Sequence, residues 1–215
     1  ELSDASIVVN AHSVIKNIEI SGTGNGLFQL IEDSSSGVEA SGLYFHHTTG
    51  RGMFVLRGAA TISGSLFFNI QLDQVSGHAR GLQGWALEGT TEVTVENLVF
   101  EKGGQLVVAG PDTTVFATDI FGRNSFASGS DTEPTISQFI AGFNGSTVTA
   151  KRVFGDLITG MGITFGTGSS ADIAFAVISN TVTLPDGSGG NGILVSDSAM
   201  NMHHGLIRNT SEVGL

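Results

Sequence analysis

Short stretches of alternating apolar residues follow a glycine at many points along the chain. Their apolar side chains recur every second residue, and β-branched and aromatic residues dominate them. No pattern with a period of 3.6 residues persists, so the sequence predicts short β-strands and no helices. The stretches are GNGLFQL (24–30), GRGMFVL (50–56), ARGLQGWAL (79–87), GGQLVV (103–108), GMGITF (160–165), GNGILV (190–195) and VGL (213–215).

The glycines before these stretches are spaced as in a repeat protein. Their spacings are 26, 29, 23, 58, 30 and 22 residues, and the 58 is two periods with Thr135-Ile136 in the missing place. A second motif, which ends in an apolar pair or triplet, lies between them, and we count about eight units. The glycines are Gly26, Gly52, Gly81, Gly104, Gly162, Gly192 and Gly214. The second motif is SVIKNIEI (13–20), VEASGLYF (38–45), ATISGSLF (60–67), VTVENLVF (93–100), VFATDIFG (115–122), VTAKRVFG (148–155), ADIAFAVI (171–178) and MNMHHGLI (200–207).

Repetition of one two-strand pattern in the same order favours a parallel solenoid over an antiparallel sandwich, which needs no such order. Each coil would stack its strands on the previous coil, so that like residues form ladders. We expect the repeat glycines at sharp turns with positive φ. We also expect an asparagine ladder at one corner, because Asn tolerates the left-handed conformation. Its members are Asn69, Asn124, Asn180 and Asn209, with His47 in the same place.

The repeat style resembles that of the right-handed parallel β-helix superfamily, the pectate-lyase-like solenoids, from about Ser6 to the end. GRGMFVLRGAATISGSLF (50–67) and LEGTTEVTVENLVF (87–100) are most similar to Gly-rich β-helix repeats of exported or surface bacterial proteins. The resemblance implies an all-β, right-handed parallel β-helix (solenoid) of about eight coils. It also implies one domain over residues 1–215, either complete or a segment of a longer chain, and an extracellular or cell-surface location.

The catalytic signatures of this superfamily are missing. A polygalacturonase-like site needs N-x-D, D-D, G-H-G and R-x-K motifs, but here Ala79 follows Gly77-His78 and no D-D pair occurs. The paired carboxylates that would do general acid–base work are therefore absent. Pro111, Pro134 and Pro185 lack the nearby Arg of a pectate-lyase-like site. The resemblance extends to the fold and not to an activity.

Charge and composition exclude several function classes. The net charge of −11 repels nucleic acid and anionic membrane surfaces. No run approaches the roughly 18–20 apolar residues of a membrane span, so we expect no membrane insertion. The chain has no Cys, which excludes disulfides and Cys-based zinc sites.

Two arginines form the best candidate binding site. Arg51 and Arg80 each precede a repeat glycine and are 29 residues apart, one coil. They would lie on neighbouring strands, about 5 Å apart at the backbone, with Arg57 and His78 close in sequence. Such a patch could hold a sugar carboxylate or sulfate bidentately. The alternative is that each Arg pairs with a nearby acid, such as Glu32, Asp33 or Asp73.

We predict no metal site and no cofactor. The pairs His46-His47 and His203-His204 lie about six coils apart, too far to share one ion. Adjacent strand residues face opposite sides, so each pair should have one inward and one outward ring. SGSDTEP (128–134) and LPDGSGGNG (184–192) are long excursions that supply too few oxygens for calcium.

The sequence therefore favours a non-enzymatic structural or adhesive solenoid: a stalk, a filament subunit or a glycan-binding segment. Its expected partners are a polysaccharide, or further copies of itself stacked end to end. The alternative is a polysaccharide lyase or glycoside hydrolase that acts on acidic polysaccharide, with Arg51, Arg80 and His78 on the active ridge.

Overall fold

The chain folds entirely into β-strands over the part that the structure describes. This structure is a computed structural model that describes residues 7–9, 12–22, 26–29, 37–73, 79–84, 90–126, 128–129, 134–135, 137–184 and 186–211. No helix occurs among these residues, and none of them belongs to a segment that could cross a membrane as a helix.

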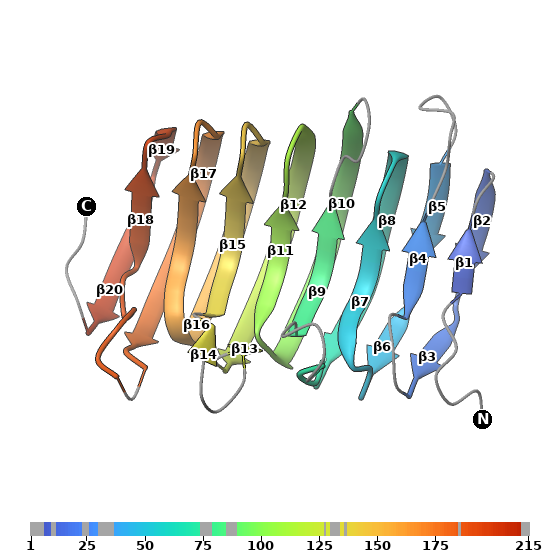
Figure 1. Cartoon of the computed structure of the whole chain (residues 1–215), viewed down its shortest axis with the longest axis horizontal. Helices are drawn as coiled ribbons and strands as arrows, with labels where there is room; N and C mark the ends of the chain where they lie inside the picture. The colour runs from blue at the N-terminus through green and yellow to red at the C-terminus, as the bar shows by residue number, and fades with distance from the viewer. Residues whose placement is uncertain are drawn as a thin grey trace.

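Eighteen strands pair into one curled sheet with two layers, a front series and a back series (Figure 1). The front series is β1 (Ile7–Val9), β4 (Leu27–Gln29), β7 (Gly50–Val55), β9 (Ala79–Gly84), β11 (Gln105–Ala109), β15 (Ser137–Phe143), the C-terminal part of β16 (Thr147–Gly166) and β18 (Ile193–Ser196). The back series is β2 (Ser13–Lys16), β3 (Glu19–Ser21), β5 (Gly37–Ser41), β6 (Tyr44–His46), β8 (Gly58–Phe68), β10 (Thr91–Gly103), β12 (Thr113–Ser125), the N-terminal part of β16, β17 (Ser170–Val182), β19 (Ala199–His203) and β20 (Leu206–Thr210).

Every pairing within this sheet is parallel, which confirms the all-β class and the parallel stacking predicted from the repeats. Val93 of β10, for example, lies between Ala60 of β8 and Val115 of β12. Among the described residues, only β13 (Ser128–Gly129) and β14 (Pro134–Thr135) form an antiparallel pair of strands, at the two ends of the predicted excursion 128–134. In Figure 1 the strands follow one another along the long axis in chain order.

The chain turns at two corners each time it crosses the back series, and the residue at each corner has positive φ. The corner residues of successive strands form two columns. In the first corner the residues have φ between 53° and 62°, and each residue of the second corner follows five positions later. The asparagine ladder predicted from the sequence is in the second corner, with the expected positive φ. The first corner is Asn17, Gly42, Gly64, Asn97, Asp119, Arg152, Phe175 and His204. The second corner is Gly22, His47, Asn69, Lys102, Asn124, Leu157, Asn180 and Asn209.

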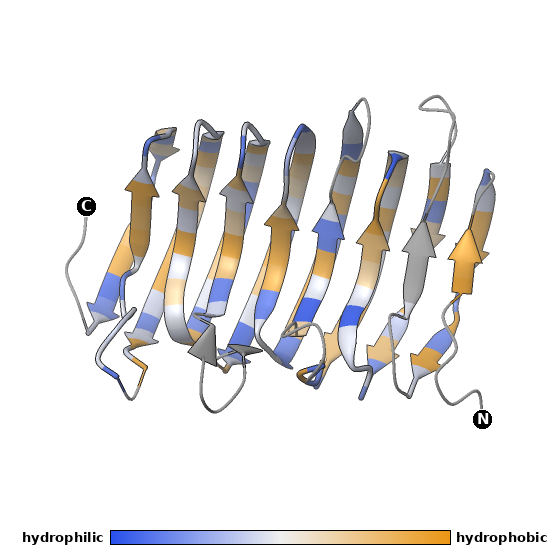
Figure 2. Cartoon of the chain, viewed as in Figure 1, coloured by the Kyte–Doolittle hydropathy of each residue, from blue (hydrophilic) through white to orange (hydrophobic). Residues whose placement is uncertain are grey.

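The core lies between the two layers and is built from columns of like residues. Val38, Ala60, Val93, Val115 and Val148 form one buried column of the back series. The apolar bands continue from strand to strand in Figure 2. In the parallel stack, each strand contributes one apolar side chain to each inward column, and that side chain is removed from water.

The repeat glycines have a different role from the one predicted. Gly26, Gly52, Gly81, Gly162 and Gly192 are not among the positive-φ residues. A Cβ on Gly52 would lie 2.5 Å from the Phe67 ring, and one on Gly81 would lie 3.0 Å from the Phe100 ring. Gly26, Gly52 and Gly81 face the interior and leave room for phenylalanines of the back series. Gly162 and Gly192 leave room for Ile178 and Ile207 in the same way, so the expectation of turn glycines is wrong.

The register also differs from the predicted one in the middle of the chain. Leu106 and Phe139 occupy the column of Gly81 and Gly162, whereas Gly104 and Thr135-Ile136 were predicted there. The reason is that large and small side chains change places between the two layers of the core. Where the back series changes from Phe100 to Gly122, the front series changes from glycine to a large residue.

Candidate functional site

Arg51 and Arg80 are direct register partners on β7 and β9, as the repeat spacing predicts. The column continues through Gln105 of β11 and Gln138 of β15. Both arginines are half-buried. Parallel pairing fixes their backbones at the strand separation of about 4.8 Å, so two guanidinium groups share one part of the outer surface of the front series.

Glutamine side chains hold both guanidinium groups. The Nε of Arg80 donates to Oε1 of Gln105 at 2.5 Å. The Nε of Arg51 donates to Oε1 of Gln83, and Gln105 in turn donates to Gln138. Gln83 is 1% exposed and Gln105 is 4% exposed. These buried amides restrict the guanidinium groups, and both arginine–glutamine bonds engage the Nε rather than a terminal nitrogen.

An aromatic ring supports the first arginine. The Cζ of Arg51 lies 4.5 Å from the centroid of the Phe54 ring, within cation–π distance. Such stacking orients the planar guanidinium as well as stabilising its charge. We name this set of Arg51, Arg80, Phe54, Gln83 and Gln105 the arginine–amide site.

Burial and mutual repulsion disfavour the charged forms of the two arginines. Burial, and after it the charge of Arg51, lowers the pKa of Arg80 to about 10. Burial lowers the pKa of Arg51 too, and Asp73 partly opposes this. Both effects on Arg80 disfavour its cation. An oxyanion between the two guanidinium groups would reverse the second effect and replace lost solvation with charge-assisted hydrogen bonds.

The structure places Arg57 away from this pair. Arg57 lies beyond Val55, where β7 ends, so roughly 13 Å of extended strand separates Arg51 from that end alone. His78 lies outside the described residues, as do Glu32 and Asp33. The sequence reasoning missed the supporting amides. The only signal for these amides in the sequence is a glutamine within the apolar stretch of successive repeats. Whether such a glutamine lies beside an arginine depends on the strand register.

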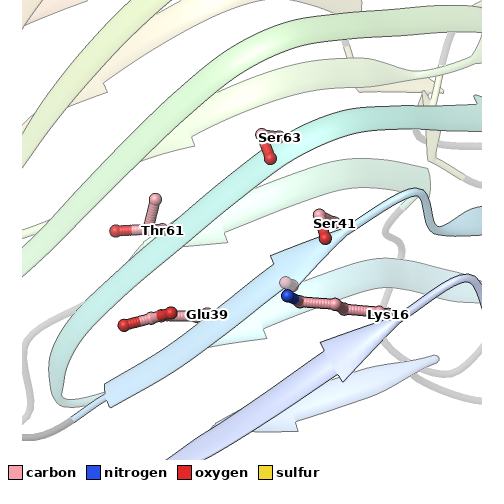
Figure 3. Close-up of a pocket in the computed structure, with 6 residues that line it drawn as sticks. Lys16, Glu39, Ser41, Thr61 and Ser63 are labelled. Atoms are coloured by element: carbon pink, nitrogen blue, oxygen red, sulfur yellow. The ribbon is translucent and has the colours of Figure 1, made fainter.

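A second, polar hollow lies on the outer face of the back series. It is about 290 Å³ in volume and is lined by Lys16, Glu39, Ser41, Thr61 and Ser63, together with Ala40. Figure 3 shows these side chains on neighbouring strands β2, β5 and β8. All five polar side chains are exposed or half-exposed. The hollow therefore lacks the buried polar supports of the arginine–amide site.

The histidine pairs do not alternate between the interior and the surface as predicted. His47 and His204 occupy the left-handed corners, so both rings of each pair are on the outside. His46 contacts His47 through their Nδ1 atoms at 2.9 Å and Glu19 through Nε2 at 2.8 Å. Among the described residues, no group of three or more His, Cys, Asp or Glu side chains is arranged to hold a metal ion.

The chain matches no protein-family model, no curated protein and no solved structure.

Proposed function

We propose that this protein is a right-handed parallel β-helix of about eight coils, pectate-lyase-like in architecture, that serves as a rigid, non-enzymatic scaffold of an exported or cell-surface protein. The scaffold holds an acidic polysaccharide through the arginine–amide site. The observation that carries this proposal is the register pairing of Arg51 and Arg80 on buried glutamines.

The ligand class follows from the donors. Two planar guanidinium groups on adjacent strands suit the carboxylate or sulfate of a sugar polymer, which each group can bind bidentately. The chain as a whole is acidic, with a net charge of −11. A local cationic pair on such a surface gives an anionic polymer one preferred point of attachment and repels it elsewhere.

Oligogalacturonate and a sulfated oligosaccharide test this function, with a neutral oligosaccharide of equal length as the reference. We expect Arg80→Gln to weaken binding of an acidic oligomer by at least about tenfold. The same substitution should raise the free energy of unfolding without ligand by about 1 kcal/mol, because it removes a half-buried like charge. Isothermal titration calorimetry and urea unfolding measure the two effects.

Arg123→Gln is the matched control. Arg123 is a surface arginine whose Nη2 donates to both oxygens of Glu101 at 3.1 Å. Its replacement should leave binding unchanged. Equal losses in both variants, or no binding of any acidic oligomer, would contradict the proposal. Release of unsaturated sugar products would instead support the lyase alternative.

End-to-end association belongs to the same proposal. Met200, Met202 and Ile207 of β19 and β20 pack against the core but are only partly buried. At the preceding level Ile173 and Ile178 are fully buried. At the opposite end of the stack Ile15 is half-buried and Ile18 is 37% exposed. A second copy stacked in the same register would bury the exposed columns at both ends.

A further inference from the structure

An unbroken row of apolar side chains runs along the outside of the back series. Its members are direct register partners on successive strands, and each lies two residues after the first corner. We name it the outer apolar row: Tyr44, Leu66, Val99, Phe121, Phe154, Val177 and Leu206.

The row points away from the core. Val99 is 39% exposed, whereas its strand neighbours Leu98 and Phe100 are buried. Leu206 is 49% exposed, and the other members are half-buried. On the same strand β10, the outward positions before the corner are the polar Thr94 and Glu96. On β12 the register partner of Thr94 is the exposed Phe116, but the apolar residues that continue from strand to strand lie between the two corners. A contiguous apolar strip at the surface indicates an interaction surface.

The ring geometry limits what can occupy the row. Phe121 and Phe154 stack on each other with centroids 5.1 Å apart and planes 1° apart. Their faces are turned toward each other, so their edges point outward. A flat sugar or nucleobase needs an open ring face, whereas side chains of a second sheet pack well against edges.

Charged residues line both sides of the row. On the corner side, Asp119 accepts hydrogen bonds from the Nε and Nη2 of Arg152. On the other side lie Glu101, Arg123 and Asp156. On each side, acidic and basic residues lie on neighbouring strands. The hydrogen bonds from Arg152 lower the pKa of Asp119. The borders can therefore pair with a copy of themselves.

We propose that the outer apolar row is the contact surface of a two-fold symmetric dimer, in which a second copy of this chain packs row against row. A second copy has the same strand spacing of about 4.8 Å. Its side chains therefore repeat at the same distance as those of the row, so the two rows match along their whole length. An unrelated surface has no reason to repeat at that distance.

Both two-fold arrangements of the copies oppose unlike charges. With the axis along the stacking direction, Asp119 faces Arg123 of the second copy and Arg152 faces Asp156. With the axis along the strands and midway between Phe121 and Phe154, Asp119 faces Arg152 of the second copy. Such an interface is isologous and closes at two copies.

The size of the row predicts a weak dimer. Seven levels span about 29 Å, and the five residues from corner to corner span about 16 Å. The footprint is thus about 500 Å² per copy, against about 800 Å² per partner in a standard stable interface. We therefore expect the dimer to dissociate on dilution through the micromolar range.

Sedimentation equilibrium over a concentration series tests the dimer. The wild-type chain should show a monomer–dimer equilibrium, and Val99→Lys should weaken it by at least about tenfold, because the ammonium is desolvated at the centre of the interface. Thr94→Lys places the same charge at an outward position of the same strand and should leave the equilibrium unchanged. Thermal unfolding of both variants shows whether they fold.

Cross-linking of single cysteines reports the arrangement of the copies, since the natural chain has no Cys. Leu66→Cys should cross-link to itself through a short bismaleimide if the axis follows the stack. It should cross-link to Leu206→Cys, in a mixture of the two, if the axis follows the strands. A wild-type chain that stays monomeric at high concentration, equal weakening by both lysine variants, or no cross-link in either sample would overturn the proposal. Sugar binding by Arg80 is measured separately and is unaffected by any of these outcomes.

Discussion

At the scale of single residues, the left-handed corners are the most demanding positions. Asn, Asp and Gly accept positive φ at low cost, but two corner positions hold large apolar residues. Leu157 has φ of 53° and Phe175 has φ of 56°. Phe175 stacks on His204 with ring centroids 4.9 Å apart, which compensates part of its strain. Leu157 is 47% exposed and sits at the same kind of corner.

Leu157→Asn should therefore stabilise the protein. Asparagine adopts the left-handed conformation readily, and the exposed leucine gives up little packing. We expect the free energy of unfolding to rise by about 1 kcal/mol, as measured by urea unfolding. Val182→Asn is the control, because Val182 is 46% exposed, is not among the positive-φ residues and lies outside the outer apolar row. A stabilisation of equal size in the control would show that the corner conformation is not the cause.

At the scale of the strands, the core is organised by an exchange of volume between the two layers. Phe67 and Phe100 of the back series face Gly52 and Gly81 of the front series. Phe139 of the front series instead fills the space left by two back-series glycines. A Cβ on Gly122 would lie 2.3 Å from its ring, and one on Gly155 would lie 2.8 Å from it.

This exchange predicts a strong coupling between Gly122 and Phe139. Phe139→Ala alone should cost about 3–5 kcal/mol through the cavity that it leaves, and Gly122→Ala alone about 1–3 kcal/mol through overpacking. Together they should cost at least about 1 kcal/mol less than the sum. Gly52→Ala faces Phe67 and should be equally harmful with or without Phe139. Additive costs at Gly122 would contradict the packing described above.

At the scale of the whole molecule, we propose two different ways for the stack to associate. The proposed contact at the outer apolar row is symmetric and closes at two copies. The proposed contact between the partly exposed columns at the ends is head-to-tail, does not close and so extends into filaments. The two modes differ in how particle mass grows with concentration.

Met202→Lys should block the end-to-end mode, because a charge then interrupts the inward column at the contact. At concentrations well above the range of the monomer–dimer equilibrium, light scattering of the wild-type chain should show the mass rising beyond two copies, while the variant stops at the dimer. Asn201→Lys, at the neighbouring outward position, should behave as the wild type does. Growth that continues unchanged in Met202→Lys would rule out the end columns as the contact.

Much of the fold follows from local patterning. The alternation around Val93 and Val95 determines the strands, and the spacing of the repeats determines that they stack in parallel. The asparagines at 69, 124, 180 and 209 determine a left-handed corner, because that conformation is a property of the residue itself. The pairing of Arg51 with Arg80 follows from the same spacing.

What the sequence by itself determined is thus the class of the fold, its repeat and one of its corners, since these depend on interactions between residues near in the chain or one repeat apart. Only the tertiary structure decided that the repeat glycines face large apolar side chains, that Phe139 takes a glycine's place, and that buried glutamines hold the arginines. It also decided that the middle residue of each apolar triplet lies outside. Each of these depends on which side chains meet across the core or along a column, and a shift of one residue in register reverses that choice.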